Sequence, residues 1–418
     1  MQLTCSSYRL AHVRPLLVAT LAAALLCPPS ARAGEGPFFI AYTHQMEEPG
    51  NLELAVKNLV GHPDGGNLFL GGTTEFEYGA KAWWTTELYL DAQGTSGQGA
   101  LFTGYRWENR FRLLPREHWI NPVLYVEFEN INGADKSLLE VVGNDGKDDL
   151  TSPNHEARTE KMREIETKLI LSSHFRGWTI AENFIAEKNV RHAPYEFGYA
   201  AGISRALAQV ARPTPCNLCA ENFEVGAEMY GGLGTHRDFG LQNTSHYVAP
   251  TLVWNLANGP ALRISPGFGL TGTSARFLLR FGISYEIAQA GRAVRNLFGG
   301  SRAMAASLIE RVPARAADSV NPLESNEPAF EAGRKLYARE CAACHGSHLE
   351  GIGKAPPLNQ AEVKTAPPGV LFWILRNGSL RRGMPSFAHL PEPQRWQIIT
   401  FIRSHNLEGG QSGPQPPL

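Results

Sequence analysis

The sequence has no long apolar run and no excess of either charge. Its 418 residues carry 39 Lys and Arg against 40 Asp and Glu, so it is not a polybasic nucleic-acid binder, and we expect no nucleic-acid partner. A hydrophobic content of 43% is too high for a disordered chain. No window reaches the roughly 18 to 20 uninterrupted apolar residues of a membrane-spanning helix. The length leaves room for two or three domains.

The sequence is also poor in cysteine. Six cysteines are too few for a disulfide scaffold in a chain of this length, so each pair needs its own explanation. Cys216 and Cys219 form a CxxC pair that no histidine follows, which excludes haem attachment. We expect a local disulfide in an oxidising compartment, with a redox-active or metal-binding pair as the alternative.

The N-terminus resembles a secretory signal. The apolar stretch 16–27 is only about a dozen residues, follows Arg9 and Arg14, and precedes Ala31-Arg32-Ala33, a small-x-small cleavage site. We expect residues 1–33 to be removed. Acylation of Cys27 in a lipoprotein is the rival interpretation, but Leu26 and Pro28 fit it poorly.

Residues 34–287 have the two-residue periodicity of β-strands. In 277–287 the odd-numbered positions are apolar, while Arg280, Ser284 and Glu286 lie on the other face. This alternation continues over about 250 residues in segments of 10 to 14, which fits tilted strands of an outer-membrane barrel better than a sandwich of roughly 100 residues. Aromatics near segment ends are candidates for interfacial girdles. They are Trp83, Trp84, Trp178, Tyr195, Tyr247 and Trp254. We predict an all-β barrel, with a secreted all-β domain as the alternative.

The loop lengths give a topology for this barrel. Counting back from 275–287, the links at 258–260, 209–220, 174–177, 114–119 and 78–81 fall on the periplasmic side. The longest link, 131–160, then falls outside, as the rule of short periplasmic turns requires. The count gives about twelve strands from Asn51 onward. It leaves Phe38 to Met46 as a strand-like piece that must be periplasmic or lumenal.

Residues 288–325 separate this region from a helical one. The stretch is basic and alanine-rich and ends in VNPLESNEP, where Pro322 and Pro328 discourage regular structure. We interpret it as a solvated linker with one short helix around 303–311, in preference to a specific docking element.

The clearest chemistry is the motif Cys341-Ala342-Ala343-Cys344-His345. Two thiols at this spacing reach the two vinyl groups of one haem, and the following histidine ligates the iron, so the motif predicts one covalent c-type haem. A zinc or thioredoxin-like site is the alternative. The second axial ligand needs a free lone pair, and we predict the thioether of Met384, which Pro385 follows. His389 and His405 remain possible ligands.

Residues 327–408 resemble a class I cytochrome c domain. The matching segments are GRKLY, CAACHG, APPL at 355–358, Trp373 with RNG at 376–378, GMPSF, and the terminal helix RWQIITFIR. The resemblance implies a small all-α fold in which a carbonyl of Pro356 or Pro357 orients His345 and Trp373 packs beside the haem. We therefore place the cytochrome c domain at 326–408 and a flexible tail at 409–418.

The leading functional hypothesis is electron transfer by this haem domain, tethered to an outer-membrane barrel in contact with lipid. His/Met ligation leaves no open position for a substrate, so an electron carrier is favoured over a catalyst, with periplasmic redox proteins as partners. In one alternative the barrel is a channel or binding surface and the haem domain is a redox sensor or docking module. In another the chain is a soluble secreted redox protein.

Overall fold

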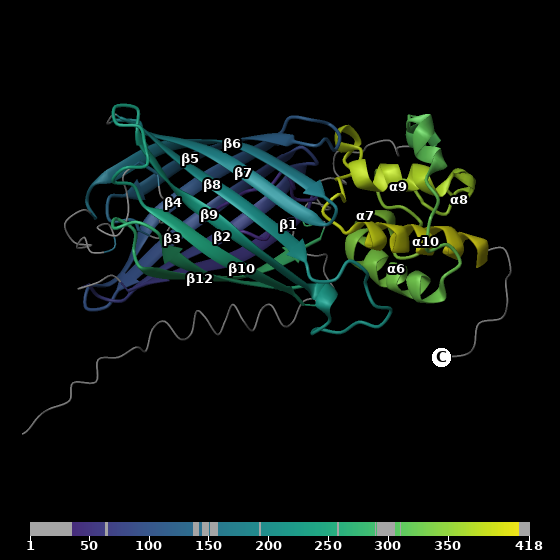
Figure 1. The fold of residues 1–418 in the computed structure, drawn as a ribbon. Coiled ribbons are helices and arrows are strands. Elements are labelled where there is room, and N and C mark those ends of the chain that lie inside the picture. The colour runs from purple at the N-terminus through teal and green to yellow at the C-terminus, as the bar shows by residue number, and fades with distance from the viewer. Residues whose placement is uncertain are drawn as a thin grey trace, which may run out of the picture.

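The structure is a computed structural model that describes residues 36–62, 66–136, 142–143, 150, 158–191, 194–256, 259–288, 290, 306–309 and 311–408. The expected signal peptide and the tail 409–418 lie outside these residues. The described chain forms a closed β-barrel followed by a small helical domain set against one end of it (Figure 1). The predicted fold class, an all-β barrel followed by an all-α domain, is confirmed.

The barrel is an antiparallel meander of twelve strands in which each strand pairs with its neighbours in the chain. It closes where β1 pairs with β12, with Leu52 opposite Ile287 and Gly61 opposite Leu278. The strands are β1 (Leu52–Gly61), β2 (Phe69–Lys81), β3 (Trp84–Thr95), β4 (Gly99–Arg112), β5 (Asn121–Asn132), β6 (Lys161–Phe175), β7 (Trp178–Asn189), β8 (Tyr195–Ala206), β9 (Phe223–Thr235), β10 (His246–Asn255), β11 (Ala261–Gly269) and β12 (Phe277–Ile287). Closure leaves no unpaired sheet edge.

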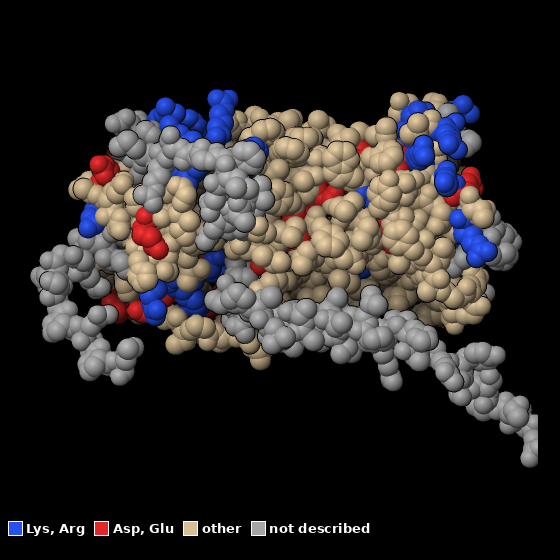
Figure 2. All heavy atoms as spheres, turned by 180° about the vertical axis from the view of Figure 1, so that it is seen from behind, with Lys and Arg blue, Asp and Glu red and all other residues tan. Residues whose placement is uncertain are grey.

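The barrel wall is apolar outside and polar inside. On β3, Leu88 and Leu90 are exposed on the outer surface, whereas Glu87, Tyr89 and Asp91 between and beside them are buried. Figure 2 shows an outer wall that is mostly uncharged between the charged far end and the helical domain. Glu182 on the outer face of β7 breaks this pattern. Within the described residues, no helix has both the length and the apolar character needed to cross a membrane.

One residue of the expected aromatic girdles faces the other way. Tyr247 is 0% exposed and stacks on Tyr230 inside the barrel, with ring centroids 5.4 Å apart. The reason is the two-residue period of β10, because Leu252 is exposed on the outer face and an odd-numbered position must therefore point inward. The assignment of Tyr247 to a girdle was wrong. Trp83, Trp178 and Tyr195 are exposed.

Ion pairs fill part of the lumen. Arg106 of β4 lies 3.0 Å from Asp91 and 3.2 Å from Glu127. Arg110 lies two inward positions beyond Arg106 on the same strand. It is 2.6 Å from Glu77. Paired charges tolerate burial because each compensates the desolvation of the other. The charge network thus lies in the same lumen as an apolar cluster that includes Phe38, Leu59 and Leu278.

The strand-like piece Phe38 to Met46 runs through the lumen and is not a thirteenth wall strand. The carboxylate of Glu228 on β9 accepts the backbone N–H groups of Phe39, Ile40 and Ala41 at 3.2, 2.9 and 3.1 Å. Asn183 of β7 donates to the carbonyl of Tyr42 at 2.9 Å. These polar wall residues satisfy backbone groups that would otherwise lie unpaired in the interior. We call residues 36–50 the lumenal segment.

The helical domain is built on two long helices, α6 and α10, whose residues form one apolar core. The Asn326 side chain caps α6 by accepting the N–H of Ala329 at 2.9 Å. A Cβ at Gly333 of α6 would lie 1.9 Å from the carbonyl oxygen of Gln397 on α10, so only glycine fits this crossing. The elements are α5 (Ala306–Ile309), η2 (Ala314–Asp318), α6 (Glu327–Glu340), α7 (Ala342–His345), α8 (Ala361–Thr365), α9 (Pro368–Asn377), η3 (Leu380–Arg382) and α10 (Glu392–Glu408).

The second half of the expected linker is part of this domain. Asn321 donates to the hydroxyl of Thr400 on α10 at 2.9 Å, and Leu323 packs against the apolar core. A Cβ at Gly369 of α9 would lie 2.0 Å from the carbonyl oxygen of Ala316 in η2, which shows how closely the two elements pack. Residues 311–325 are therefore docked, and their interpretation as a solvated tether was wrong. The sequence indicated a tether because the segment is mostly polar. The few residues that anchor it do not recur at a regular spacing, so they gave no sign of a helix or strand.

Candidate haem site

The CxxCH motif lies where α6 ends and the one-turn helix α7 follows. Cys341 is buried, Cys344 is half-buried, and neither forms a disulfide. The hydroxyl of Tyr337 on α6 donates to the carbonyl of Gly346 at 2.7 Å and holds the loop against the core. Gly346 has φ of 78°, a conformation that favours glycine. The fold therefore presents both thiols and the histidine on one short, fixed turn.

His345 is held by a backbone carbonyl. Its Nδ1 lies 2.8 Å from the carbonyl oxygen of Pro356. Because a carbonyl can only accept, Nδ1 must carry the proton, which leaves the Nε2 lone pair available to a metal. Burial lowers the pKa of His345, although the bond to Pro356 opposes this shift, so the imidazole stays neutral. Of the two prolines in the resemblance, Pro356 makes this contact, and Pro357 follows it in the same loop.

Met384 lies in a loop fixed at its base. Gly383 adopts the left-handed conformation, and Ser379 and Met384 pair through backbone bonds of 2.8 and 3.3 Å. The Met384 side chain is half-buried and packs against the apolar core. His389, an alternative ligand, lies toward the barrel, with its ring centroid 6.5 Å from that of His174 on β6.

These residues fit a c-type haem. Two thiols outside any disulfide match covalent attachment to two vinyl groups, and an imidazole with an available ring nitrogen and a thioether could supply the two axial donors. Cys341, Cys344, His345, Pro356 and Met384 all lie in, or pack on, the same small domain. The assignment of the two axial ligands remains a prediction.

Trp373 lies at the border between the two domains. It is half-buried on α9, and the guanidinium of Arg116, in the β4–β5 link, lies 5.2 Å from the centre of its ring. Its neighbour Phe372 instead stacks on Trp396 of α10 at 4.1 Å. The predicted position of Trp373 beside the haem stays a prediction.

Glu117 of the β4–β5 link joins the Met384 loop to the barrel. It accepts the hydroxyl hydrogen of Ser386 at 2.6 Å, and its backbone N–H donates to the side chain of Asn377 at 3.3 Å. The same carboxylate pairs with Arg112 at 2.5 Å and with Nε2 of His44 at 3.0 Å. The Glu117 side chain therefore contacts the barrel wall, the lumenal segment and the Met384 loop of the helical domain, which we call the haem domain.

The charge of Glu117 and the tautomer of His44 are consistent with each other. Burial lowers the pKa of His44, and its bond to Glu117 opposes the shift. Burial alone would raise the pKa of Glu117, but the hydrogen bond from His44 and the charge of Arg112 outweigh it and hold that pKa well below its usual range. Ser172 accepts the backbone N–H of His44 at 2.7 Å and also bonds to Nδ1. A neutral His44 with its proton on Nε2 donates to an ionised Glu117 and satisfies all these bonds.

A second contact joins the β8–β9 link to α6 and α10. The side chain of Gln397 accepts from the backbone N–H of Ala211 at 3.1 Å and donates to its carbonyl at 2.9 Å. Lys335 donates to the carbonyl of Arg212 at 2.6 Å and pairs with Glu221 at 3.2 Å. Cys216 and Cys219 are joined by a disulfide in this link, next to the short helix η1 (Ala220–Asn222). This long link therefore serves as a docking arm.

A cavity of about 70 Å³ remains between the barrel end and the haem domain. Met46 and His174 line it from the barrel, and Pro385, Phe387 and Gln394 line it from the haem domain. The Met384 loop thus faces the barrel lumen. The sequence singled out neither Glu117 nor Gln397, since a single polar residue in a link or on a helix carries no periodic signal.

Comparisons with known proteins support the assignment of the helical domain. The family model for "Cytochrome C oxidase, cbb3-type, subunit III" matches residues 328–402. The helical domain is therefore a cytochrome c domain, which implies a covalently bound c-type haem and haem-based electron transfer. The search of curated proteins gave no match to this chain.

Several solved structures show a weak similarity to part of the chain. A KdgM porin in complex with disordered oligogalacturonate is 7% identical with a TM-score of 0.29, covering 56% of this chain and 98% of that one. LpxR from Salmonella typhimurium is 9% identical with a TM-score of 0.31, covering 56% and 99%. Outer membrane phospholipase A from Escherichia coli is 8% identical with a TM-score of 0.30, covering 61% and 94%. At these values the likeness adds nothing to the strand topology described above.

Proposed function

We propose that this protein is an electron carrier with one covalent c-type haem, fixed to the outer membrane by its barrel, and that it exchanges electrons with periplasmic redox proteins. The observation that carries the proposal is the His345–Pro356 bond of 2.8 Å beside two thiols that form no disulfide, on a domain docked to a barrel. The sequence holds one CxxCH motif, which supports a single haem.

The protein's side chains would fix the cofactor in place. A c-type haem supplies reversible one-electron chemistry. Cys341 and Cys344 attach it, and His345 is held in orientation by Pro356. Met384 offers the softer donor, which favours the reduced state. Glu117 anchors the loop that carries Met384 through Ser386.

The membrane anchor rests on the polarity of the barrel. An apolar outer wall and an ion-paired interior are the arrangement that lipid requires and that water disfavours. A soluble secreted protein would expose Leu88, Trp107 and Phe184 to water on a continuous surface, which promotes aggregation. This observation favours the membrane over the secreted alternative.

The filled lumen argues against an open channel. Tyr89, Tyr125 and Lys168 are fully buried inside the barrel, and the lumenal segment passes among them. The haem domain also covers one mouth through Glu117 and Gln397. Planar-bilayer recording of the refolded protein should give no steady conductance, and a stable open pore would favour the channel alternative.

Partners should approach from the side of the haem domain. The apolar band of such barrels is about 25 Å tall, so one haem at the barrel mouth cannot carry electrons across the membrane alone. We assign this side to the periplasm because the short links 174–177 and 114–119 lie there. Protease should cleave the haem domain only after the outer membrane of intact cells is permeabilised.

A spectrum tests the ligand assignment. Met384→Ala should abolish the methionine–iron charge-transfer band of the oxidised protein and lower its reduction potential, because the thioether is lost. His389→Ala in the same loop is the matched control and should keep the band. The assignment fails if Met384→Ala keeps the band or if His389→Ala removes it.

A further inference from the structure

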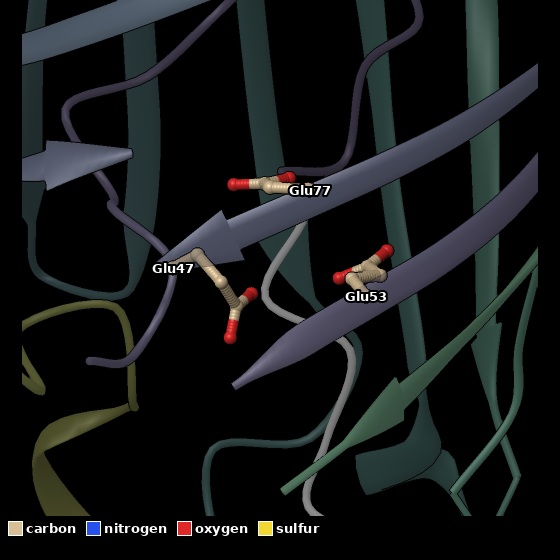
Figure 3. Close-up of side chains that lie close together, drawn as sticks. All are labelled: Glu47, Glu53 and Glu77. Atoms are coloured by element: carbon tan, nitrogen blue, oxygen red, sulfur yellow. The ribbon is translucent and has the colours of Figure 1, made fainter. Parts of the chain in front are cut away.

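Three glutamates meet inside the barrel at its haem-domain end (Figure 3). They are Glu47 of the lumenal segment, Glu53 of β1 and Glu77 of β2, and one carboxylate oxygen from each lies within 4.8 Å of the others. The three residues are 1%, 1% and 3% exposed. They come from three separate chain segments, so the fold itself gathers the negative charge.

The carboxylates are not fully compensated. Within the described residues, neither Oε2 of Glu47 nor Oε2 of Glu77 has a hydrogen-bond partner. The other oxygen of Glu47 accepts the backbone N–H of Glu48 at 2.9 Å. Buried carboxylate oxygens without partners are costly, so they indicate a missing counter-charge.

The nearest cations are already engaged. Arg110 pairs with Glu77 at 2.6 Å, but it also pairs with Glu87 at 2.5 Å and Glu108 at 2.7 Å. Arg263 lies 3.8 Å from Glu53, at the limit of an ion pair. Arg110 is therefore shared by three buried carboxylates and cannot by itself neutralise the three glutamates.

We propose that Glu47, Glu53 and Glu77 bind one divalent cation of the calcium type. Oxygens that share an ion lie no further apart than twice the metal–oxygen distance, which is about 4.6–5.2 Å for Ca²⁺, so one ion can contact all three. Among the described residues the cluster holds carboxylates and neither His nor Cys, which selects hard cations over zinc or copper.

The ion would fix the point where the lumenal segment enters the barrel wall. There, Gly50 donates to the carbonyl of Gly79 at 2.7 Å, and Gly79 donates to the carbonyl of Asn51 at 3.1 Å. A Cβ at Gly79 would lie 2.0 Å from the carbonyl oxygen of Glu48, so segment and strand touch. The ion ties Glu47 on one side of this turn to Glu53 and Glu77 on the other. This role is independent of electron transfer.

Calcium binding to the full-length, haem-loaded protein in detergent tests the proposal. After chelator treatment, equilibrium dialysis against Ca²⁺ should give one bound ion per chain, and Ca²⁺ should raise the temperature at which the barrel loses its compact gel mobility. Glu47→Gln, Glu53→Gln and Glu77→Gln should each weaken binding at least tenfold. Glu75→Gln should leave binding unchanged, since Glu75 faces the same lumen on the same strand but pairs with Lys57 at 2.8 Å.

Two results would overturn the proposal. One is the absence of bound Ca²⁺ in the wild-type protein, which would mean that protons compensate the carboxylates. The other is binding that Glu47→Gln and Glu53→Gln leave intact, which would place the ion elsewhere. Dialysis against Mg²⁺ alone should show at least tenfold weaker binding, and equal affinity would contradict the calcium assignment. The compact gel mobility of each unheated variant confirms that its barrel has folded, and none of these outcomes depends on electron transfer.

Discussion

The two domains have opposite interiors. The haem domain packs Leu336, Ile398 and Phe401 into an apolar core and turns its charges outward. The barrel buries Arg106, Arg110 and many carboxylates beside an apolar cluster, and it exposes large apolar side chains such as Leu88 on its outer wall. The difference shows that the surroundings of each domain decide which residues are buried: water around the haem domain and, on our proposal, lipid around the barrel wall.

The largest expected effect is the complete loss of covalent haem from the helical domain, with no loss of the barrel. Replacing Cys341 and Cys344 with Ala should abolish covalent haem on a denaturing gel, because both thioether bonds are lost, while the barrel keeps its heat-dependent gel shift. Replacing Cys216 and Cys219 with Ala is the matched control and should retain haem. Covalent haem in the first variant would contradict the attachment site.

Removal of a lumenal cation should destabilise the barrel strongly. Arg110→Ala leaves Glu77, Glu87 and Glu108 without their shared partner, which should lower the free energy of unfolding by about 3–5 kcal/mol. Urea unfolding of the refolded protein, followed by barrel mobility on a gel, measures this loss. Leu59→Ala, also inside the barrel, should cost about 2–5 kcal/mol through its cavity alone, with no salt dependence. An Arg110→Ala barrel as stable as wild type would refute the charge network.

A charge placed on the outer surface should distinguish lipid from water. Leu88→Arg on the barrel wall should cost about 2–4 kcal/mol in a bilayer, since the position is 41% exposed toward the proposed lipid. Val320→Arg, at a position 76% exposed on the haem domain, should change stability by less than about 0.5 kcal/mol. Unfolding in lipid vesicles compares the two, and equal small effects would contradict the membrane location of the wall.

Acid should loosen the junction between the domains. Burial lowers the pKa of His44 from its ordinary value of 6.5. Below about pH 6.5, His44 is therefore protonated more readily when the domains are undocked than when they are docked, so acid favours the undocked form. The pKa of Glu117 is lowered from 4.5, so its contribution is complete above that pH and falls in stronger acid. Hydrogen exchange in residues 383–390, corrected for intrinsic rates, should be faster at pH 5.5 than at pH 7.5. His44→Gln should remove this difference, and greater protection in acid would contradict the scheme.

Much of the fold could be predicted because its signals are local and periodic. The alternation in 277–287 fixed a strand, its parity fixed which face points inward, and Cys341 to His345 defined the attachment turn. Two features could not be predicted from the sequence: the docked position of residues 311–325 and the course of the lumenal segment. They depend on single long-range contacts, such as Glu228 with the N–H groups of 39–41, which leave no repeating pattern in the sequence. Glu117 was missed for the same reason.

Fractionation of cells with haem staining tests the central claim most directly, because it asks whether one chain carries both haem and a membrane barrel. The account predicts a single haem-stained band of full length in the outer-membrane fraction, which shifts in mobility when the sample is heated. A haem-stained band in the soluble periplasmic fraction, unchanged by heating, would contradict it.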